Sequence, residues 1–334
     1  MIAQLEPLYV RTKPGKTVVR LLSYTLFEGR PLTTRGRWIN PIVLFLLRQG
    51  KKVPLTRRVQ KPVFIIGIGR SGTTVLGLVL SVHRDFGFLN EPKALWHVIY
   101  PQEDLVGNYK EGFARYHLTA EEATATVSAA AHRLFGLYLI VTNSRRLVDK
   151  YPELVFRIPF VKAIFPDAKF LLLCRNGWDI CRSIDAWSRS KSVKKRHMTY
   201  NWWGVNNRKW RLLLEQVAVK DSQLGNIIHN IRKFTKQTDM AAVEWILSMR
   251  EGLRMLDLYP DDIHVVRYER LVSNPQDTLR DIMRFCEVPL DETVVNYARH
   301  TLRRCSASRQ HISLNPVIVP VFESTMLELG YNIN

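Results

Sequence analysis

The sequence predicts an α/β fold in which a mostly parallel sheet is flanked by helices. Short apolar segments rich in β-branched residues recur along the chain, and each is followed by turn residues and then by a helical pattern. The layout is clearest at residues 63–66, 169–174 and 263–268. Strands that are apolar throughout are typical of parallel sheets, because helices bury both faces of such a sheet.

The composition is that of a folded, basic protein. The chain has 334 residues, of which 46% are hydrophobic and 10% aromatic, so it can bury the core of one large α/β domain or of two ordinary ones. Its 49 lysines and arginines exceed its 30 acidic residues and give a formal net charge of +19. Such a charge favours an anionic partner, whether nucleic acid, acidic lipid, a phosphorylated cofactor or a polyanionic substrate.

The cysteines Cys174, Cys181, Cys286 and Cys305 show no C-x-x-C spacing. With the nine histidines they form no zinc-type ligand pattern, so we expect a reducing compartment and no structural metal. The N-terminus lacks the apolar segment of a signal peptide, and no apolar run is long enough to span a bilayer. These features predict a cytoplasmic protein, soluble or peripheral at a membrane.

Residues 1–60 are predicted to form a basic, irregular N-terminal extension laid over a domain at 61–334, with turn signals at Pro14 and Pro41. Within the extension, residues 37–52 place a short apolar block and a tryptophan between cations. This pattern suits an interfacial membrane segment. It also suits a helix packed on the core behind a basic surface, which is where short apolar runs more often lie.

The first unit of the domain runs from a buried strand at 63–66 through a glycine-rich loop into a helix at 73–82. A short strand follows at 86–89, and residues 120–139 have strong helix propensity.

Two further units repeat this layout. After a turn at 165–168, a strand at 169–174 leads into a helix from about residue 179. The last strand, 263–268, precedes a helix that begins near Pro275.

Residues 186–240 interrupt the alternation and are predicted to form a helical insertion. Their cations are interleaved with Tyr200, Trp202, Trp203 and Trp210. Basic residues beside aromatic ones suit stacking on a base or a sugar ring next to an anion. A solvated insertion whose tryptophans pack inward fits the same pattern, so both interpretations stay open.

The glycine-rich loop matches two phosphate-binding templates. Read as G-x-G-x-x-G from Gly67, it is the dinucleotide fingerprint, and Glu91 stands where the ribose-binding acid belongs. Read from Gly67 to Thr74, it is a P-loop in which Thr73 replaces the usual lysine.

The neighbouring residues argue against both templates. Arg70 adds a cation, and Thr73 and Thr74 add hydroxyls, so the loop suits a terminal phosphate-like group better than a passing pyrophosphate. A kinase also needs a downstream carboxylate for magnesium, but the strand at 169–174 is followed by Arg175. We therefore predict a P-loop-like site that holds its donor by arginine, hydroxyls and amides without a metal.

A second phosphate site is predicted where the strand at 169–174 meets its helix. Arg175 and Ser183 are eight residues apart across this strand-to-helix turn, so a guanidinium and a hydroxyl can close on one phosphate. The pair alone is a weak signal, but it gains specificity from the buried strand and the companion loop.

At these residues the sequence resembles the sulfotransferases that use 3′-phosphoadenosine 5′-phosphosulfate (PAPS), in particular their carbohydrate and tyrosylprotein branches. Residues 64–74 look like the family's 5′-phosphosulfate loop, and Arg175, Asn176, Asp179 and Ser183 look like its 3′-phosphate motif. The segments LVDKYPELVFRIPFVKAIFPDAKF and VVRYERLVSNP are also similar to family elements. The resemblance covers roughly residues 63–286. It implies the sulfotransferase fold, PAPS as co-substrate, 3′-phosphoadenosine 5′-phosphate (PAP) as product, and no metal.

The resemblance also implies which residues bind the donor: Gly69, Arg70, Ser71, Gly72, Thr73, Thr74, Arg175 and Ser183. In the family, a C-terminal loop closes on the nucleotide, and residues 303–316 occupy that place here. Ser306, Ser308 and Arg309 are therefore further candidates, although a basic polar loop without such a role fits as well.

Sulfuryl transfer to a hydroxyl needs a base for the acceptor proton and positive charge for the oxygen that leaves sulfur. By resemblance, Glu91 is the base, and Arg70 and Lys150 are the cations. The family more often has threonine, serine or an acid where this chain has Tyr151, and this departure weakens the assignment of Lys150. His97 and Lys93 follow Glu91 closely enough in the sequence to assist it in proton transfer.

The resemblance favours a carbohydrate or glycoconjugate hydroxyl as acceptor and leaves a tyrosylprotein, lipid or small-molecule acceptor open. Nucleic acid is not expected as a partner, and the sequence indicates no oligomeric state. Two other classes remain as alternatives. One is a dehydrogenase- or kinase-like nucleotide-binding protein without sulfotransfer, and the other is a basic lipid- or nucleic-acid-binding protein.

Overall fold

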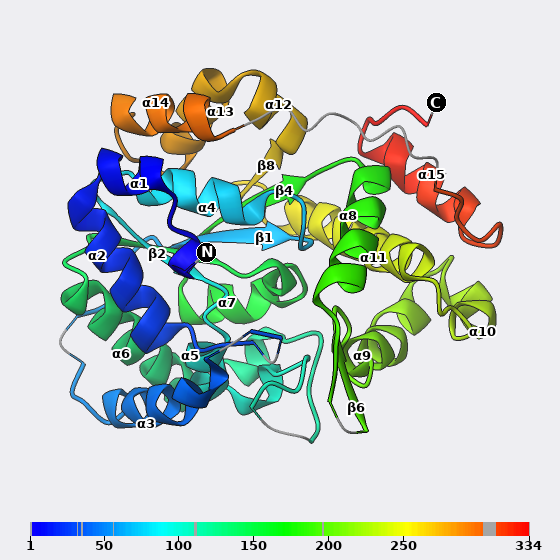
Figure 1. Ribbon diagram of the computed structural model, residues 1–334, viewed down its shortest axis with the longest axis horizontal. Helices are drawn as coiled ribbons and strands as arrows, with labels where there is room; N and C mark the ends of the chain where they lie inside the picture. The colour runs from blue at the N-terminus through cyan, green and yellow to red at the C-terminus, as the bar shows by residue number, and fades with distance from the viewer. Residues whose placement is uncertain are drawn as a thin grey trace.

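The computed structural model describes residues 2–31, 33–34, 36–55, 57–109, 112–195, 197–302 and 312–333. Within these residues, five parallel strands form one sheet in the order β2–β3–β1–β4–β8. The strands are β1 (Val63–Gly67), β2 (Phe86–Asn90), β3 (Arg146–Lys150), β4 (Lys169–Cys174) and β8 (Ile263–Arg267). The predicted α/β fold with a mostly parallel sheet is confirmed (Figure 1).

Helices cover both faces of this sheet (Figure 1). Because side chains alternate along a strand, Val63 and Ile65 of β1 pack into one core, and Phe64 and Ile66 pack into the other. The first core includes residues of α1 (Pro7–Thr12), α4 (Thr73–Ser81), α12 (Tyr268–Ser273), α13 (Pro275–Phe285) and α14 (Glu292–Thr301). The second includes residues of α5 (Lys93–Ile99), α6 (Ala125–Val141), α7 (Ile158–Ile164), α8 (Gly177–Lys191), α11 (Gln237–Leu258) and α15 (Val319–Glu328).

The predicted strands and helices lie close to their expected places, and two helices differ at their starts for a capping reason. The helix α6 begins at Ala125 instead of 120, because the Thr124 side chain accepts a hydrogen bond from the backbone N–H of Val127. The helix α8 begins at Gly177, earlier than expected, because the Asn176 side chain accepts from the N–H of Trp178.

The strand β3 was not predicted from the sequence. It lies in the interior of the sheet between β1 and β2. Its sequence, Arg146 to Lys150, contains three charged residues among five and so lacks the apolar run typical of a buried parallel strand. Two of these charges, Asp149 and Lys150, are nevertheless buried.

Residues 1–60 contain regular helices where an irregular segment was expected. The helices are α1, α2 (Pro14–Leu22) and α3 (Asn40–Gly50). Pro14 and Pro41, which had suggested turns, lie in the first turns of α2 and α3, where proline is favoured. Val43 and Leu47 of α3 are buried in the same core as Phe64 of β1. No described helix combines the length and apolar character needed to cross a bilayer.

The insertion at 186–240 is only partly helical. Within the described residues it holds a small antiparallel sheet of β5 (Val193–Lys195), β6 (Met198–Asn201) and β7 (Gly204–Val205), followed by α9 (Arg208–Gln216) and α10 (Ile228–Ile231). Short 3₁₀ or π turns are η1 (Ile2–Gln4), η2 (Ser23–Phe27), η3 (Arg37–Ile39), η4 (Pro101–Glu103), η5 (Ala120–Glu122), η6 (Pro152–Arg157), η7 (Ala218–Lys220) and η8 (Gly225–Ile227).

Candidate active site

The candidate site residues lie at the carboxyl ends of neighbouring strands. The phosphate-loop residues follow β1, Glu91 follows β2, Lys150 ends β3 and Arg175 follows β4. In a parallel sheet these ends meet at one edge, and ligands of α/β proteins bind there. The register places Asn90 of β2 beside Lys150, so the residues predicted as base and cation lie close together.

The loop between β1 and α4 is built for a tight turn. Gly67 has φ +133° and Gly72 has φ +99°, and a Cβ at Gly72 would lie 2.4 Å from the Tyr268 ring. The Ser71 hydroxyl donates to the Ile68 carbonyl oxygen at 2.7 Å and therefore stays within the loop. Glycine is thus required at two places in this turn, and α4 begins at its end with free N–H groups that favour an anion.

Arg70 joins the two predicted phosphate sites. Its Nε donates to the Ser183 hydroxyl at 3.1 Å, and its carbonyl oxygen accepts from Nη1 of Arg175 at 3.1 Å. Burial and the neighbouring Arg175 both lower the pKa of Arg70. Two arginines whose charges oppose each other in this way favour an anion beside them.

Arg175 is held rigidly. Its guanidinium lies 4.4 Å from the centre of the Tyr268 ring, and Nη2 is 3.6 Å from the Asp179 carboxylate. Its carbonyl oxygen accepts from the Trp245 indole at 3.1 Å. The Nε atom is buried and has no hydrogen-bond partner in the described chain, so one donor of this guanidinium is unsatisfied.

Glu91 and Lys150 form an ion pair. Lys150 Nζ donates to Glu91 Oε1 at 2.5 Å, and the Glu91 N–H donates to the Lys150 carbonyl oxygen at 2.7 Å. Lys93 Nζ lies 3.5 Å from the other carboxylate oxygen. Although burial acts to raise the pKa of Glu91, Lys150 and then Lys93 hold it below its usual value, so the carboxylate is ionised.

A chain of alternating charges continues from Lys93 away from Glu91. Glu153 lies 3.4 Å from Lys93 and 3.6 Å from Lys209, and Lys209 lies 2.5 Å from Glu244. Burial opposes the ionisation of Glu153, but Lys93 and Lys209 lower its pKa to about 2. Sequence reasoning missed these partners, because they come from η6, α9 and α11 and meet only in the folded chain.

The phosphate loop and the Glu91–Lys150 pair share one cavity of about 460 Å³, whose lining does not include Arg175 or Ser183. Gly69, Arg70, Thr73, Thr74, Glu91 and Lys150 line it, together with Tyr200 and Trp202 of the insertion and Thr33 and Thr34 of the N-terminal segment. Trp202 approaches the loop so closely that a Cβ at Gly69 would lie 2.6 Å from its ring. The Trp202 indole donates to Glu244 at 2.7 Å, which fixes the ring in this place.

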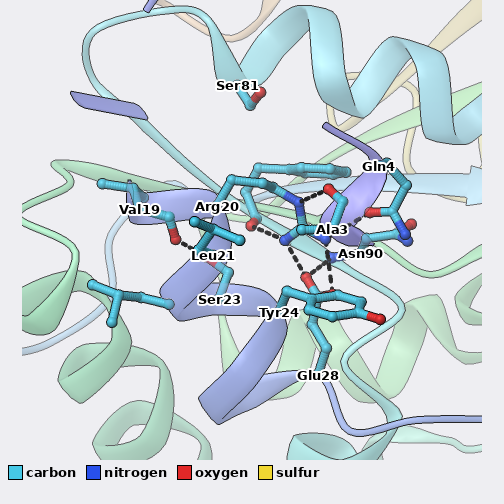
Figure 2. A network of polar contacts seen from close by, with 12 residues as sticks. Ala3, Gln4, Val19, Arg20, Leu21, Ser23, Tyr24, Glu28, Ser81 and Asn90 are labelled. Atoms are coloured by element: carbon cyan, nitrogen blue, oxygen red, sulfur yellow. Dashed lines mark hydrogen bonds and ion pairs between the residues drawn. The ribbon is translucent and has the colours of Figure 1, made fainter. Parts of the chain in front are cut away.

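The N-terminal segment anchors the turn that carries Glu91 (Figure 2). Arg20 Nη2 donates to Glu28 Oε2 at 2.8 Å, and Arg20 Nε donates to the Ala3 carbonyl oxygen at 3.1 Å. The Glu28 carboxylate also accepts from the N–H of Asn90, next to Glu91, at 2.8 Å. Figure 2 shows Arg20 between the 3₁₀ turn at Ala3 and the carboxylate of Glu28.

Comparison with known proteins shows the family. The model described as "Sulfotransferase family" matches residues 62–221 and 221–292, which is more than half of the chain. The chain belongs to the sulfotransferase family. It is 24% identical over 258 residues to a protein-tyrosine sulfotransferase of Drosophila melanogaster, a match that covers 76% of this chain and 43% of that protein. It is 26% identical over 231 residues to nodulation protein NoeE of Sinorhizobium fredii, which covers 66% of this chain and 48% of that protein.

The sulfotransferase fold is also seen in solved structures. Sulfotransferase STF9 of Mycobacterium avium aligns with a TM-score of 0.50 at 13% identity, over 96% of this chain and 94% of that one. The two curated proteins above are longer, and the chain spans less than half of each.

The remaining predicted residues lie away from the cavity or outside the described residues. Ser306, Ser308 and Arg309 lie outside the described residues. His97 is buried with its ring 5.1 Å from that of Tyr109.

The structure divides the aromatic residues of the insertion between the two interpretations. Tyr200 and Trp202 line the cavity, whereas Trp203 and Trp210 are buried. Tyr151, the departure from the family pattern, donates its hydroxyl to Glu103 at 2.6 Å and leaves Lys150 to face Glu91. No group of three or more histidine, cysteine or acidic residues is arranged as a metal site within the described chain.

Proposed function

We propose that this sulfotransferase moves the sulfuryl group of PAPS to an acceptor hydroxyl and releases PAP. The observation that carries the proposal is the arrangement of Arg70, which contacts both Arg175 and Ser183 and lines the same cavity as Glu91 and Lys150. Cations and a helix start on one side, and an ionised carboxylate on the other, suit a phosphosulfate donor and a hydroxyl acceptor.

The residues present fit the donor. PAPS carries a 3′-phosphate and a 5′-phosphosulfate, and we assign Arg175 and Ser183 to the former and the loop at 69–74 to the latter. The buried, unpartnered Nε of Arg175 supports this assignment within the described chain. Arg70, Lys93 and Lys150 supply positive charge at the cavity wall, which supports transfer without a metal.

In the proposed step, Glu91 accepts the proton of the acceptor hydroxyl. The acceptor oxygen forms a bond to sulfur, and the bond between sulfur and the oxygen of the 5′-phosphate breaks with its electron pair left on that oxygen. Lys150 keeps Glu91 ionised before the proton arrives, and Arg70 balances the charge that grows on the leaving phosphate. Arg175 and Ser183, the two residues assigned to the 3′-phosphate, fix the donor for in-line attack.

We propose a carbohydrate or glycoconjugate as acceptor. The apolar face of a sugar ring packs on aromatic rings while its hydroxyls bond polar groups, and the cavity wall offers Trp187, Tyr200 and Trp202 together with Asn108 and Asn201. The relative from Drosophila melanogaster, whose name specifies protein tyrosine, supports a hydroxyl acceptor in general. We further propose that the protein works in the cytoplasm, and the free, buried Cys174, Cys181 and Cys286 support a reducing compartment.

Thermal unfolding with added nucleotides tests the donor site. PAP at 100 times its dissociation constant should stabilise the protein by about 2.7 kcal/mol, whereas NAD and ATP with magnesium should have no effect. Arg175→Ala should abolish the PAP effect, and Arg299→Ala, an exposed arginine on α14, should preserve it. Stabilisation by NAD or by ATP with magnesium, but not by PAP, would contradict the proposal.

Transfer of labelled sulfate from PAPS into separated glycan, lipid and peptide fractions tests the acceptor. We expect label in the glycan fraction. Label confined to peptide would replace the carbohydrate acceptor by tyrosine while leaving the donor assignment intact.

A further inference from the structure

The helix α3 presents one apolar face to solvent. Ile42, Phe45 and Leu46 are 53%, 59% and 44% exposed, and Trp38, just before the helix, is 75% exposed. The spacing places these residues along one side of a helix, and Val43 and Leu47 on the opposite side are buried against the core. The helix therefore has two apolar sides, of which the fold uses only one.

Exposed apolar side chains also follow the helix in the sequence. Val53 and Leu55, in the segment that follows α3, are 43% and 45% exposed. We call the set of Trp38, Ile42, Phe45, Leu46, Val53 and Leu55 the α3 face. Soluble monomeric proteins rarely expose a large contiguous apolar surface, and when they do it usually marks an interaction site.

The segment that carries the α3 face is basic. Between Glu28 and Asp85 the sequence contains no aspartate or glutamate, whereas Gly29 to Gln60 contains eight lysines and arginines. Of these, Arg48, Lys52 and Arg58 are exposed beside the apolar residues. Cations, a tryptophan and a strip of apolar side chains are the features of a helix that lies in the headgroup layer of an anionic membrane.

The α3 face is connected to the wall of the cavity. Pro31, Thr33 and Thr34, a few residues before Trp38, line the cavity. The Arg37 guanidinium lies 5.9 Å from the centre of the Tyr200 ring, which also lines it. One short segment therefore contributes both to the active-site wall and to the exposed apolar surface.

We propose that the α3 face docks on an anionic lipid surface and holds the mouth of the cavity at the headgroup layer. This proposal favours lipid over a second copy of the chain, because a symmetric contact between two α3 faces would bring their basic rims together. The docking proposal rests on the proposed function. It implies that the acceptor hydroxyl is carried by a membrane component, and the sugar headgroup of a glycolipid is the clearest chemical example.

Vesicle binding by the full chain tests the docking. The protein should cosediment with phosphatidylglycerol vesicles at low salt, and should bind phosphatidylcholine vesicles much more weakly. Phe45→Glu should weaken binding about tenfold or more, because it places a charge in the apolar layer. Phe113→Glu is the matched control, since Phe113 is 67% exposed but does not belong to the α3 face, and it should bind as the parent does.

Binding that is absent at low salt, or equal in Phe45→Glu and the parent, would overturn the proposal. So would a dimer in solution that Phe45→Glu dissociates, because the face would then be an interface between copies. A thermal shift by PAP that survives in Phe45→Glu shows that the variant is folded and separates this proposal from the donor assignment.

Transfer of sulfate tests the link to the acceptor. With a glycolipid in phosphatidylglycerol vesicles, the initial rate should fall about tenfold in Phe45→Glu, whereas the rate with the free headgroup sugar should not change. Equal losses on both substrates would overturn the membrane-borne acceptor. No transfer to either substrate by the parent, with vesicle binding intact, would instead contradict the proposed function.

Discussion

The carboxylate of Glu91 combines two properties that a proposed base needs. One oxygen bonds Lys150, and this pair keeps the group ionised, while the other lies 3.5 Å from Lys93 on the cavity side. Removal of the negative charge would leave Lys150, which is only 2% exposed, without its counter-charge. Replacing Glu91 by a neutral residue therefore affects both proton transfer and the local charge balance.

We expect Glu91→Gln to lower kcat by about a hundred- to ten-thousand-fold, because the amide cannot accept the acceptor proton. PAP affinity, measured by titration calorimetry, should change far less, since Arg175 and Ser183 are untouched. Glu287→Gln, in an exposed pair with Lys61, serves as the carboxylate-to-amide control and should keep full activity. A Glu91→Gln enzyme with parental kcat would exclude Glu91 as the base.

Individual site residues were predictable from the sequence where they belong to a local motif. Arg70, Arg175 and Ser183 stand at fixed distances from apolar strands, and the structure brings them into direct contact. Glu153 and Lys209 were not predictable, because each gains its place from charges on other elements of the fold. A glutamate and a lysine are not distinctive residue types in a chain with 30 acidic residues and 49 lysines and arginines, so neither indicated a site.

Among elements, the N-terminal segment contributes more to the active site than its sequence suggests. Arg20 and Glu28 are almost fully buried. Besides their mutual ion pair, Arg20 donates to the Ala3 carbonyl oxygen, and Glu28 accepts from the Asn90 N–H. The Glu28 backbone carbonyl also accepts from the N–H of Ala94, so Glu28 contacts both sides of the turn at Glu91. We therefore regard Glu28 as a positioning residue for this turn.

Glu28→Ala should lower the free energy of unfolding by about 3–5 kcal/mol, because it leaves the buried Arg20 without its partner. Among folded molecules, kcat should fall while the dissociation constant of PAP stays within about threefold. Glu28→Gln keeps an acceptor for the Asn90 N–H and should recover part of kcat, which a purely structural role would not require.

The matched control is Glu287→Ala, whose exposed ion pair with Lys61 should contribute less than about 1 kcal/mol. Equal kcat in Glu28→Ala and the parent, measured below the unfolding transition, would remove the positioning role and leave only a structural one.

At the scale of the whole molecule, buried acids make stability depend on pH. Burial raises the pKa of Asp149 to about 8, although the Trp96 indole donates to it at 2.8 Å. In the unfolded chain an aspartate ionises near pH 4, so between about pH 4 and 8 the unfolded state loses a proton that the folded state keeps. This difference stabilises the folded state fully below pH 4 and disappears as the pH rises through 8.

Asp149→Asn should therefore gain stability relative to the parent as the pH rises from 4 to 8, by up to about 1.4 kcal/mol per pH unit. The comparison isolates Asp149, because the other titrating groups are common to both proteins. Urea unfolding at pH 5, 6, 7 and 8 measures the difference, and Asp281→Asn on the surface is the control. A difference that is constant across this range would show that Asp149 is ionised in the folded protein.

The overall architecture was predictable because its strands are locally apolar, and its exceptions have physical causes. The strand β3 lacks the apolar pattern by which strands are recognised, because Lys150 lines the cavity at its end and Asp149 is buried beside the Trp96 indole. The small sheet of the insertion depends on pairing between segments and leaves no clear periodic signal.

The backbone at two proposed functional residues carries a cost. Arg70 has φ +72° and Glu91 has φ +49°, the left-handed region that disfavours every residue with a Cβ by about 1 kcal/mol or more. Glycine would adopt either conformation freely, but it would bring neither the cation nor the carboxylate. At these positions the backbone conformation alone favours glycine, whereas the proposed activity needs a charged side chain. Engineering for heat resistance should accordingly leave both residues untouched, although glycine would relieve the backbone strain.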